Sequence, residues 1–228
     1  MPAVHYKEQA LRFREDAIVE AVNRLLATKG YELMTVDEVA AEAGVAKASL
    51  YKHFSSKEDL AAAAMVRVLD RAIAQVGVLQ ASTSASALQQ LEAVVRWTLQ
   101  VQISGEMPTL PAQNSKLVAA LRGNRDYTDR LMALSDLLGS WITQGQSTGE
   151  LNRELPPELI LYTLFARACD PVLGLLKASG AYSDEQIIDW LVSASLTGIA
   201  APRTATPVHK PRAPGKAASV RAIRAAVR

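Results

Sequence analysis

Between Lys47 and Ser56 the sequence holds side chains that can donate hydrogen bonds to an anion, and it contains no acidic residue. Lysine ammonium groups, hydroxyl groups and a histidine ring contact phosphate oxygens and base edges in nucleic acids. The stretch could therefore bind a nucleic acid. Its outward-facing candidates are Lys47, Ala48, Ser49, Tyr51, Lys52 and His53.

Two short predicted helices must position these side chains. Thr35-Val-Asp-Glu38 has the pattern of a capping box that opens one helix, and Gly44 ends it after two turns. A second helix is expected around 47–53, and a longer one at 12–29 precedes both. The apolar residues that would clamp the pair from inside are Val39, Ala40, Val45, Leu50 and Phe54. Two short helices joined by a turn with glycine predict a helix-turn-helix within 35–54.

The stretch Thr35 to Leu60, TVDEVAAEAGVAKASLYKHFSSKEDL, closely resembles the signature of the TetR family of bacterial transcriptional regulators. The resemblance covers roughly residues 12–65. It rests on Thr35, Val39-Ala40, Ala43-Gly44-Val45, Leu50-Tyr51, His53-Phe54, Lys57 and Leu60. It implies an N-terminal three-helix DNA-binding domain, a C-terminal helical domain for ligand binding and dimerisation, and repression that a ligand relieves.

The resemblance also implies roles for individual residues. Thr35, Tyr51, His53 and Lys57 are expected to contact backbone phosphates. Lys47, Ala48 and Ser49 lie where such proteins meet base edges, and Lys52 can touch either. Lys47 has the chemistry to donate to guanine O6 and N7, and Ala48 can pack on a thymine methyl group. Ordinary surface packing is the alternative for Tyr51 and His53, and a solvated side chain is the alternative for Lys52.

The whole pattern predicts an all-α chain in three parts: a helix-turn-helix domain at 1–55, a helical effector-binding and dimerisation domain at 56–200, and a basic tail at 201–228. Helical periodicity recurs through the second part without any strand pattern. Apolar residues nearly encircle the predicted helix at about 157–178, and the helix at about 184–199 has an apolar seam. A helix that is apolar all round needs cover on both sides, so we expect homodimerisation through these two helices.

Candidates for an effector pocket are the large apolar side chains of the middle helices. They are Trp97, Met107, Trp141, Phe165 and Cys169, and plain core packing is the alternative for each. Few charges occur on these helices, although Arg167 and Asp170 stand three apart and can pair. We therefore expect a small apolar or aromatic effector that the sequence does not identify.

Charge is distributed unevenly. The chain has 25 basic and 23 acidic residues, but the last 28 residues hold seven of the basic ones and no acid, which leaves 18 basic and 23 acidic residues before them. This tail is expected to be disordered, or to become a short basic amphipathic helix on a partner. The alternative function is a nucleoid-type protein that binds DNA without sequence preference through the tail.

Several function classes are disfavoured. The three histidines lie far apart and the single cysteine, Cys169, has no histidine near it, so neither a metal site, a disulfide nor a catalytic centre is expected. No cofactor motif occurs. The charged N-terminus does not fit a signal peptide, and no uncharged apolar stretch reaches 18 residues. We expect a cytoplasmic regulator that is neither an enzyme nor a membrane protein.

Overall fold

The computed structural model describes residues 2–81, 85–108 and 116–200, without the side chains of residues 2–8 and 10, and the predicted basic tail at 201–228 lies outside these ranges. Over the described residues the prediction of an all-α fold is confirmed, since the one extended pairing there is an isolated bridge between Leu151 and Ala200. The helices are α1 (Pro2–Thr28), α2 (Gly30–Leu33), α3 (Val36–Glu42), α4 (Lys47–His53), α5 (Lys57–Gln80), α6 (Ala87–Ile103), α7 (Lys116–Gly123), α8 (Arg125–Thr148), α9 (Pro157–Ala166), the 3-10 turn η1 (Arg167–Cys169), α10 (Pro171–Ser179) and α11 (Asp184–Thr197).

The chain divides into two compact units. Of the described residues, unit 1 contains 2–70, 104–108 and 116–128, and unit 2 contains 71–81, 85–103 and 129–200. The first half of α5 and all of α7 therefore belong with the helix-turn-helix. These units describe packing, whereas the boundaries at 55 and 200 concern function and stay a prediction.

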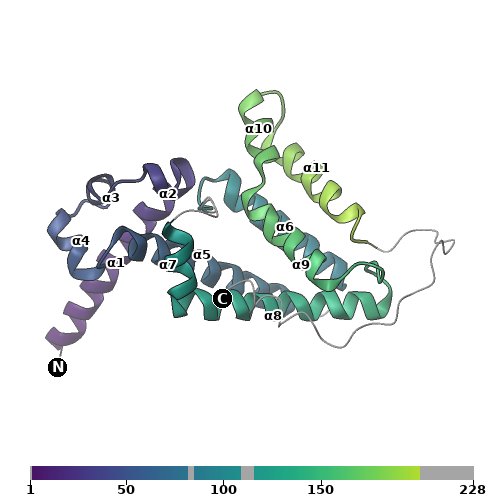
Figure 1. Ribbon diagram of the computed structural model, residues 1–228, viewed down its shortest axis with the longest axis horizontal. Coiled ribbons are helices and arrows are strands. Elements are labelled where there is room, and N and C mark those ends of the chain that lie inside the picture. The colour runs from purple at the N-terminus through teal and green to yellow at the C-terminus, as the bar shows by residue number, and fades with distance from the viewer. Residues whose placement is uncertain (1, 82–84, 109–115, 201–228) are drawn as a thin grey trace. The chain divides into compact units, whose positions relative to one another are not determined.

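Unit 1 is built on α1, which packs against α2 and α3, while α4 packs on α3 (Figure 1). Its core joins side chains of α1 to α5 and α7. Burial of these apolar side chains is the main force that holds helices as short as α3 and α4 in place, because each is too short to persist alone. The largest fully buried ones are Ile18, Leu26, Met34, Leu50, Leu60 and Leu117.

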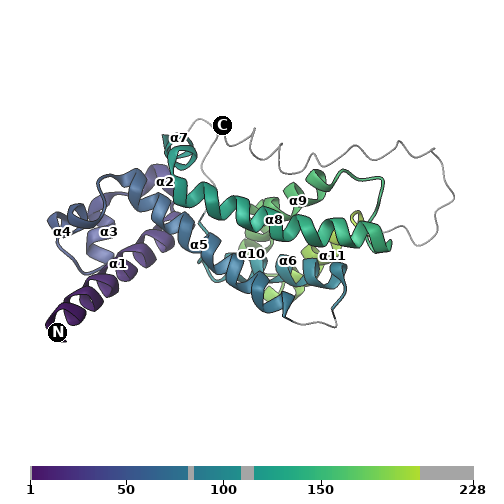
Figure 2. The same ribbon diagram turned by 90° about the horizontal axis from the view of Figure 1, so that it is seen from below.

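Unit 2 is centred on α6, which α11 and the η1 turn contact (Figures 1 and 2). The side chains of Leu91, Leu99 and Ile187 are completely buried there. At the surface the Arg96 guanidinium donates to Asp189 over 2.6 Å and ties α6 to α11. A capping box at Ser183 and Gln186 starts α11.

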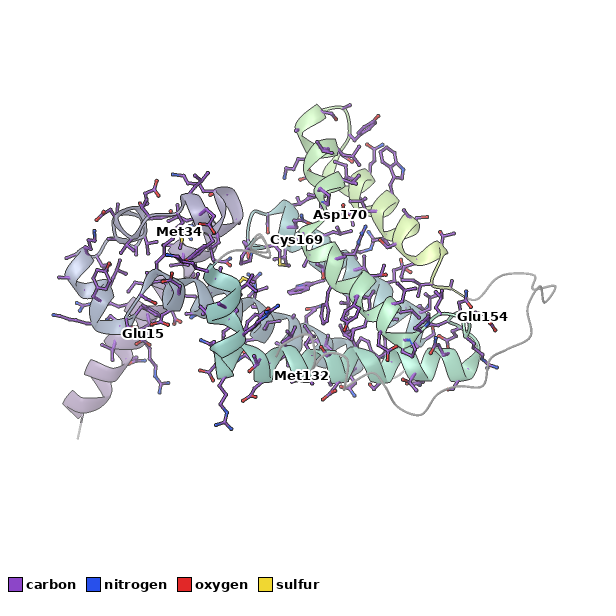
Figure 3. All side chains as sticks on the ribbon, in the orientation of Figure 1. Glu15, Met34, Met132, Glu154, Cys169 and Asp170 are labelled. Atoms are coloured by element: carbon purple, nitrogen blue, oxygen red, sulfur yellow. The ribbon has the colours of Figure 1, made fainter. Side chains whose placement is uncertain are left out.

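The predicted single helix at 157–178 is wrong, because the chain forms two helices there. Pro171 has no N–H to donate and disfavours helical geometry at the preceding residue, so Asp170 is extended, with φ −71° and ψ 109°. Asp170 then caps α10 through a 2.9 Å bond from the Val172 N–H, and its carboxylate accepts from Arg167 over 2.6 Å. Figure 3 labels Asp170 and the adjoining Cys169 at this break. The expected pairing of Arg167 with Asp170 is confirmed.

By length and composition alone, the segment Pro157–Ser179 is apolar enough to cross a membrane. The segment contains charged residues, so it is not an uncharged apolar stretch of 18 residues. One such segment is weak evidence for a span, since apolar core helices satisfy the same criterion.

Candidate nucleic-acid interface

The turn between α3 and α4 is set by local chemistry. The Thr35 hydroxyl accepts from the Glu38 N–H, and the Glu38 carboxylate accepts from the Thr35 N–H over 3.0 Å, which completes the predicted capping box. Gly44 has φ +66°, a left-handed conformation that other residues adopt at a cost. The Val45 N–H then returns to the Ala40 carbonyl over 3.0 Å. The chain therefore turns sharply and α4 starts at Lys47.

The clamp between the two helices is also as the sequence predicts. Val39, Ala40 and Leu50 are buried, and the half-buried side chains of Val45 and Phe54 pack against the same core. Burying the inward face of α4 leaves its other face open to solvent. Of the predicted DNA-contacting residues, Thr35, Lys47, Ala48, Tyr51 and Lys52 are exposed, while Ser49 and Lys57 are half-buried.

Two of the lysines have partners within unit 1. The Lys47 ammonium lies 2.9 Å from the Asp37 carboxylate, and this contact raises the pKa of Lys47. Lys57 lies over the Tyr31 ring, 4.4 Å from its centroid, and donates to the Glu32 carbonyl over 3.4 Å. Each ammonium group thus already has a partner within unit 1, and each has further N–H groups that can donate to a nucleic acid.

The acidic residues of α3 are also paired. Arg24 on α1 donates to Glu42 over 2.6 Å. Glu38 accepts from Lys29 over 2.5 Å, and that bond, together with those from Thr35, lowers the pKa of Glu38 from 4.5 to about 2. The negative charge beside the exposed face of α4 is thus balanced by cations of α1 and the turn after it, so α3 repels an approaching phosphate less than its sequence suggests.

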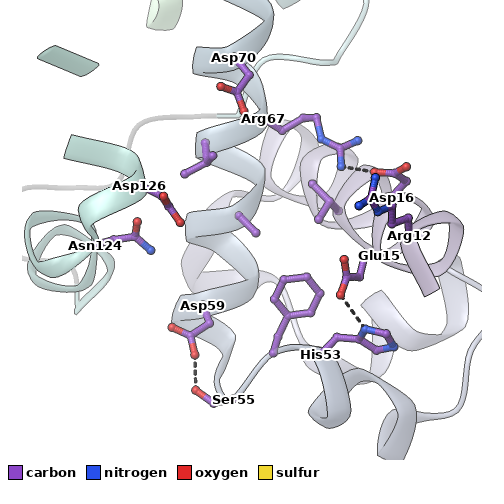
Figure 4. A pocket seen from close by; sticks show the side chains of 14 residues that line it. Arg12, Glu15, Asp16, His53, Ser55, Asp59, Arg67, Asp70, Asn124 and Asp126 are labelled. Atoms are coloured by element: carbon purple, nitrogen blue, oxygen red, sulfur yellow. Dashed lines mark hydrogen bonds and ion pairs between the residues drawn. The ribbon is translucent and has the colours of Figure 1, made fainter. Parts of the chain in front are cut away.

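His53 departs from the other candidates. Only 6% of its side chain is exposed, and its Nδ1 lies 3.1 Å from the Glu15 carboxylate on α1. The ring lines a cavity of about 680 Å³ within unit 1 (Figure 4). The predicted phosphate contact of His53 is therefore the one that fits the observed geometry least well.

Sequence reasoning missed the residues that hold these side chains. The sequence pattern places Asp37 only at the start of a helix, and it gives no signal at Glu15 or Tyr31. No periodicity links Asp37 to Lys47 or Glu15 to His53, because each pair joins different helices. Only the arrangement of the helices brings them together.

The five candidates for an effector pocket fall into both units. Trp97, Trp141, Phe165 and Cys169 belong to unit 2, whereas Met107 belongs to unit 1. Trp141 and Met107 are buried, and the other three are half-buried. A cavity of about 1000 Å³ in unit 2 lies between α6 and the end of α11, and none of the five lines it.

Within the described ranges, no group of three or more His, Cys, Asp or Glu side chains is placed to hold a metal ion. The thiol of Cys169 is half-buried in η1. The chemistry that the described side chains support at this surface is thus hydrogen bonding and charge pairing.

Comparison with known proteins adds to this picture. Residues 18–64 match the family model described as bacterial regulatory proteins, tetR family. The HTH-type transcriptional activator FasR of Mycolicibacterium smegmatis is 37% identical over 83 residues, which are 36% of this chain and 37% of FasR. The chain spans no more than 37% of the length of the curated relatives that it matches.

Solved structures extend the likeness to the second unit. The fatty acid degradation regulator FadR from Bacillus halodurans superposes with a TM-score of 0.62 at 20% identity, covering 81% of this chain and 95% of that one. The regulator FadR from Bacillus subtilis, solved in complex with stearoyl-CoA, gives a TM-score of 0.60 at 19% identity, with coverages of 80% and 98%. At these identities the likeness concerns the fold, an N-terminal helix-turn-helix followed by a helical domain.

Proposed function

Because the chain belongs to the tetR family of bacterial regulatory proteins, we propose that it is a homodimeric transcriptional repressor that a small molecule releases from a near-palindromic operator. The observation that carries the DNA-binding part is α4, whose outward face is exposed, contains no acid and follows a capped α3. A helix of this kind enters the major groove. A regulator of chromosomal DNA works in the cytoplasm.

We assign base contacts to Lys47, Ala48 and Ser49 at the start of α4, and phosphate contacts to Thr35, Tyr51 and Lys57, with Lys52 free to make either. The start of α4 is supported by the exposure of Lys47 and Ala48. A base contact by Lys47 competes with its ion pair to Asp37 for the same ammonium group.

The test compares Lys47→Ala with Lys57→Ala on an operator fragment and on random DNA of equal length. We expect Lys47→Ala to weaken the operator complex more than the random one, because only a base contact carries sequence information. Lys57→Ala should weaken both equally. Equal losses for Lys47→Ala would remove Lys47 from base readout, and a uniform footprint in place of discrete sites would favour the nucleoid-type alternative.

The dimer is proposed from unit 2. Apolar side chains on α9, α10 and α11 are exposed in the single chain, and Leu175 is 72% exposed. Tyr182, just before α11, and Trp190, on α11, stack edge to face with their ring centroids 5.0 Å apart. A partner subunit would remove this surface from water. The residues concerned are Leu159, Tyr162, Val172, Leu175, Tyr182 and Trp190.

The effector is proposed to be an apolar or aromatic small molecule. The Bacillus subtilis neighbour was solved with stearoyl-CoA, which makes a long-chain acyl thioester the first compound to test. Trp97, Trp141, Phe165 and Cys169, all in unit 2, are the residues that we assign to its site. An operator mobility shift should be reversed by stearoyl-CoA or by an aromatic acid, and activation in a reporter strain would refute repression.

A further inference from the structure

The last residue of α4, His53, is turned inward, unlike Tyr51 and Lys52 before it. Tyr51 is 50% exposed, whereas only 6% of the His53 side chain is accessible. Its Nδ1 lies 3.1 Å from Glu15 Oε1, across 38 residues of sequence. Figure 4 shows the ring and the Glu15 carboxylate facing each other. The recognition helix is therefore bonded at its C-terminal end to α1.

Glu15 stands on a rigid support. It lies on α1 one turn before Ile18, which is completely buried, and close to the buried Val19 and Val22. The bond from His53 ties α4 to α1. Because α1 also packs against α3, it holds both helices of the helix-turn-helix. The orientation of α4 is thus determined at both ends, by the turn at Gly44 and by Glu15.

The surroundings of His53 do not suit an anion. The cavity that its ring lines also holds the carboxylates of Asp16, Asp59, Asp70 and Asp126, together with the guanidinium groups of Arg12 and Arg67 (Figure 4). Arg67 is already paired with Asp16 over 2.5 Å. A phosphate at the ring would lie close to the Glu15 carboxylate, which is 3.1 Å from Nδ1, and would be repelled by it.

We propose that His53 is a positioning residue that fixes the recognition helix on α1 through Glu15 and does not contact phosphate. The inference rests on the proposed DNA binding. It departs from the phosphate contact that the sequence predicts for His53, and it adds Glu15 as a residue on which operator affinity depends.

The experiment measures operator affinity of the full chain by fluorescence anisotropy over a series of salt concentrations. His53→Ala and Glu15→Ala should each lower affinity about three- to tenfold, the range that one lost hydrogen bond produces. The double variant should be no weaker than either single one, because both remove the same bond. The slope of log affinity against log salt should stay unchanged in all three.

A phosphate contact would give the opposite pattern. If the ring bound phosphate as a cation, His53→Ala would lower the magnitude of the slope by about 0.9, and, whatever the charge of the ring, Glu15→Ala would raise affinity by removing a negative charge near the DNA. Either result overturns the proposal. The conservative variants His53→Asn, which keeps a donor at the Nδ1 position, and Glu15→Gln, which keeps the acceptor oxygen, should bind the operator nearly as the parent does. Failure of both to recover affinity would also overturn it.

A second readout needs no DNA. Amide hydrogen exchange of residues 47–54 should become faster in His53→Ala and Glu15→Ala than in the parent, because α4 has lost its second attachment. Unchanged exchange in both variants would refute the positioning role. If the parent protein binds no operator while exchange responds as expected, the proposed function fails and the link between His53 and Glu15 stands.

Discussion

Replacing Gly145 by alanine should destabilise unit 2, although alanine is the better helix former. Gly145 lies in α8, and a Cβ atom there would come 2.7 Å from Leu151 Cγ, 2.8 Å from Leu151 Cδ1 and 3.1 Å from Ala87 Cβ. Ordinary contacts are 3.4–4 Å. One of the neighbouring side chains therefore has to move.

Leu151 has little freedom to do so. It is completely buried, and its N–H donates to the Gly145 carbonyl over 3.0 Å. Overpacking of this kind costs about 1–3 kcal/mol, and three close atoms favour the upper half of that range. The higher helix propensity of alanine stabilises the variant by about 1 kcal/mol. The expected net loss in the free energy of unfolding is thus about 1–2 kcal/mol.

Gly139 provides a matched control in the same helix, since a Cβ there meets nothing within 4 Å. Gly139→Ala should stabilise the protein by about 0.5–1 kcal/mol. Scanning calorimetry should find the Tm of Gly145→Ala lower than that of the parent and the Tm of Gly139→Ala higher, by about 2–4 °C per kcal/mol. Equal Tm values for the two variants would show that Leu151 yields freely, and the reasoning from the close approach would be refuted.

Three further predictions concern unit 1 and the dimer. Thr35→Ala should destabilise unit 1 by about 1 kcal/mol in urea unfolding, and Thr35→Ser should restore most of that loss, because the serine hydroxyl can still accept the bond from the Glu38 N–H; equal stability of the two variants would contradict this. The depressed pKa of Glu38 contributes stability that is present above pH 4.5 and is lost as the pH falls towards about 2, so Glu38→Gln should flatten the acid limb of stability against pH. If Glu38→Gln leaves the loss of stability at acid pH unchanged, that loss arises from other carboxylates. Leu175→Glu should shift sedimentation from dimer to monomer, with Lys177→Glu on the same helix as the charge control, and a persistent dimer would exclude this face.

Much of the candidate nucleic-acid interface could be predicted from the sequence because its determinants are local. Thr35 and Glu38 are three residues apart and cap a helix by themselves, and Gly44 marks a turn that requires positive φ. The apolar spacing of Val39, Ala40 and Leu50 identifies the buried face, and the exposed face of α4 follows by subtraction. Interactions between residues that are close in sequence depend on few residues, so the sequence pattern is enough to predict them.

The sequence carried a signal at Asp170 as well, since a proline follows it. The apolar run from 157 to 178 concealed this signal, because periodicity alone does not register a single residue that cannot be helical. The break between α9 and α10 could therefore have been predicted from Pro171.

Other features were decided only by tertiary structure. The ring of His53 could point to solvent or to α1 with the same helix around it, and the position of Glu15, 38 residues earlier, selects the second. Lys47 and Lys57 likewise take their partners, Asp37 and the Tyr31 ring, from neighbouring helices. The exposed donors on α4 could thus be predicted from the sequence. Their partners could not, because a contact between two helices depends on the core that brings the helices together.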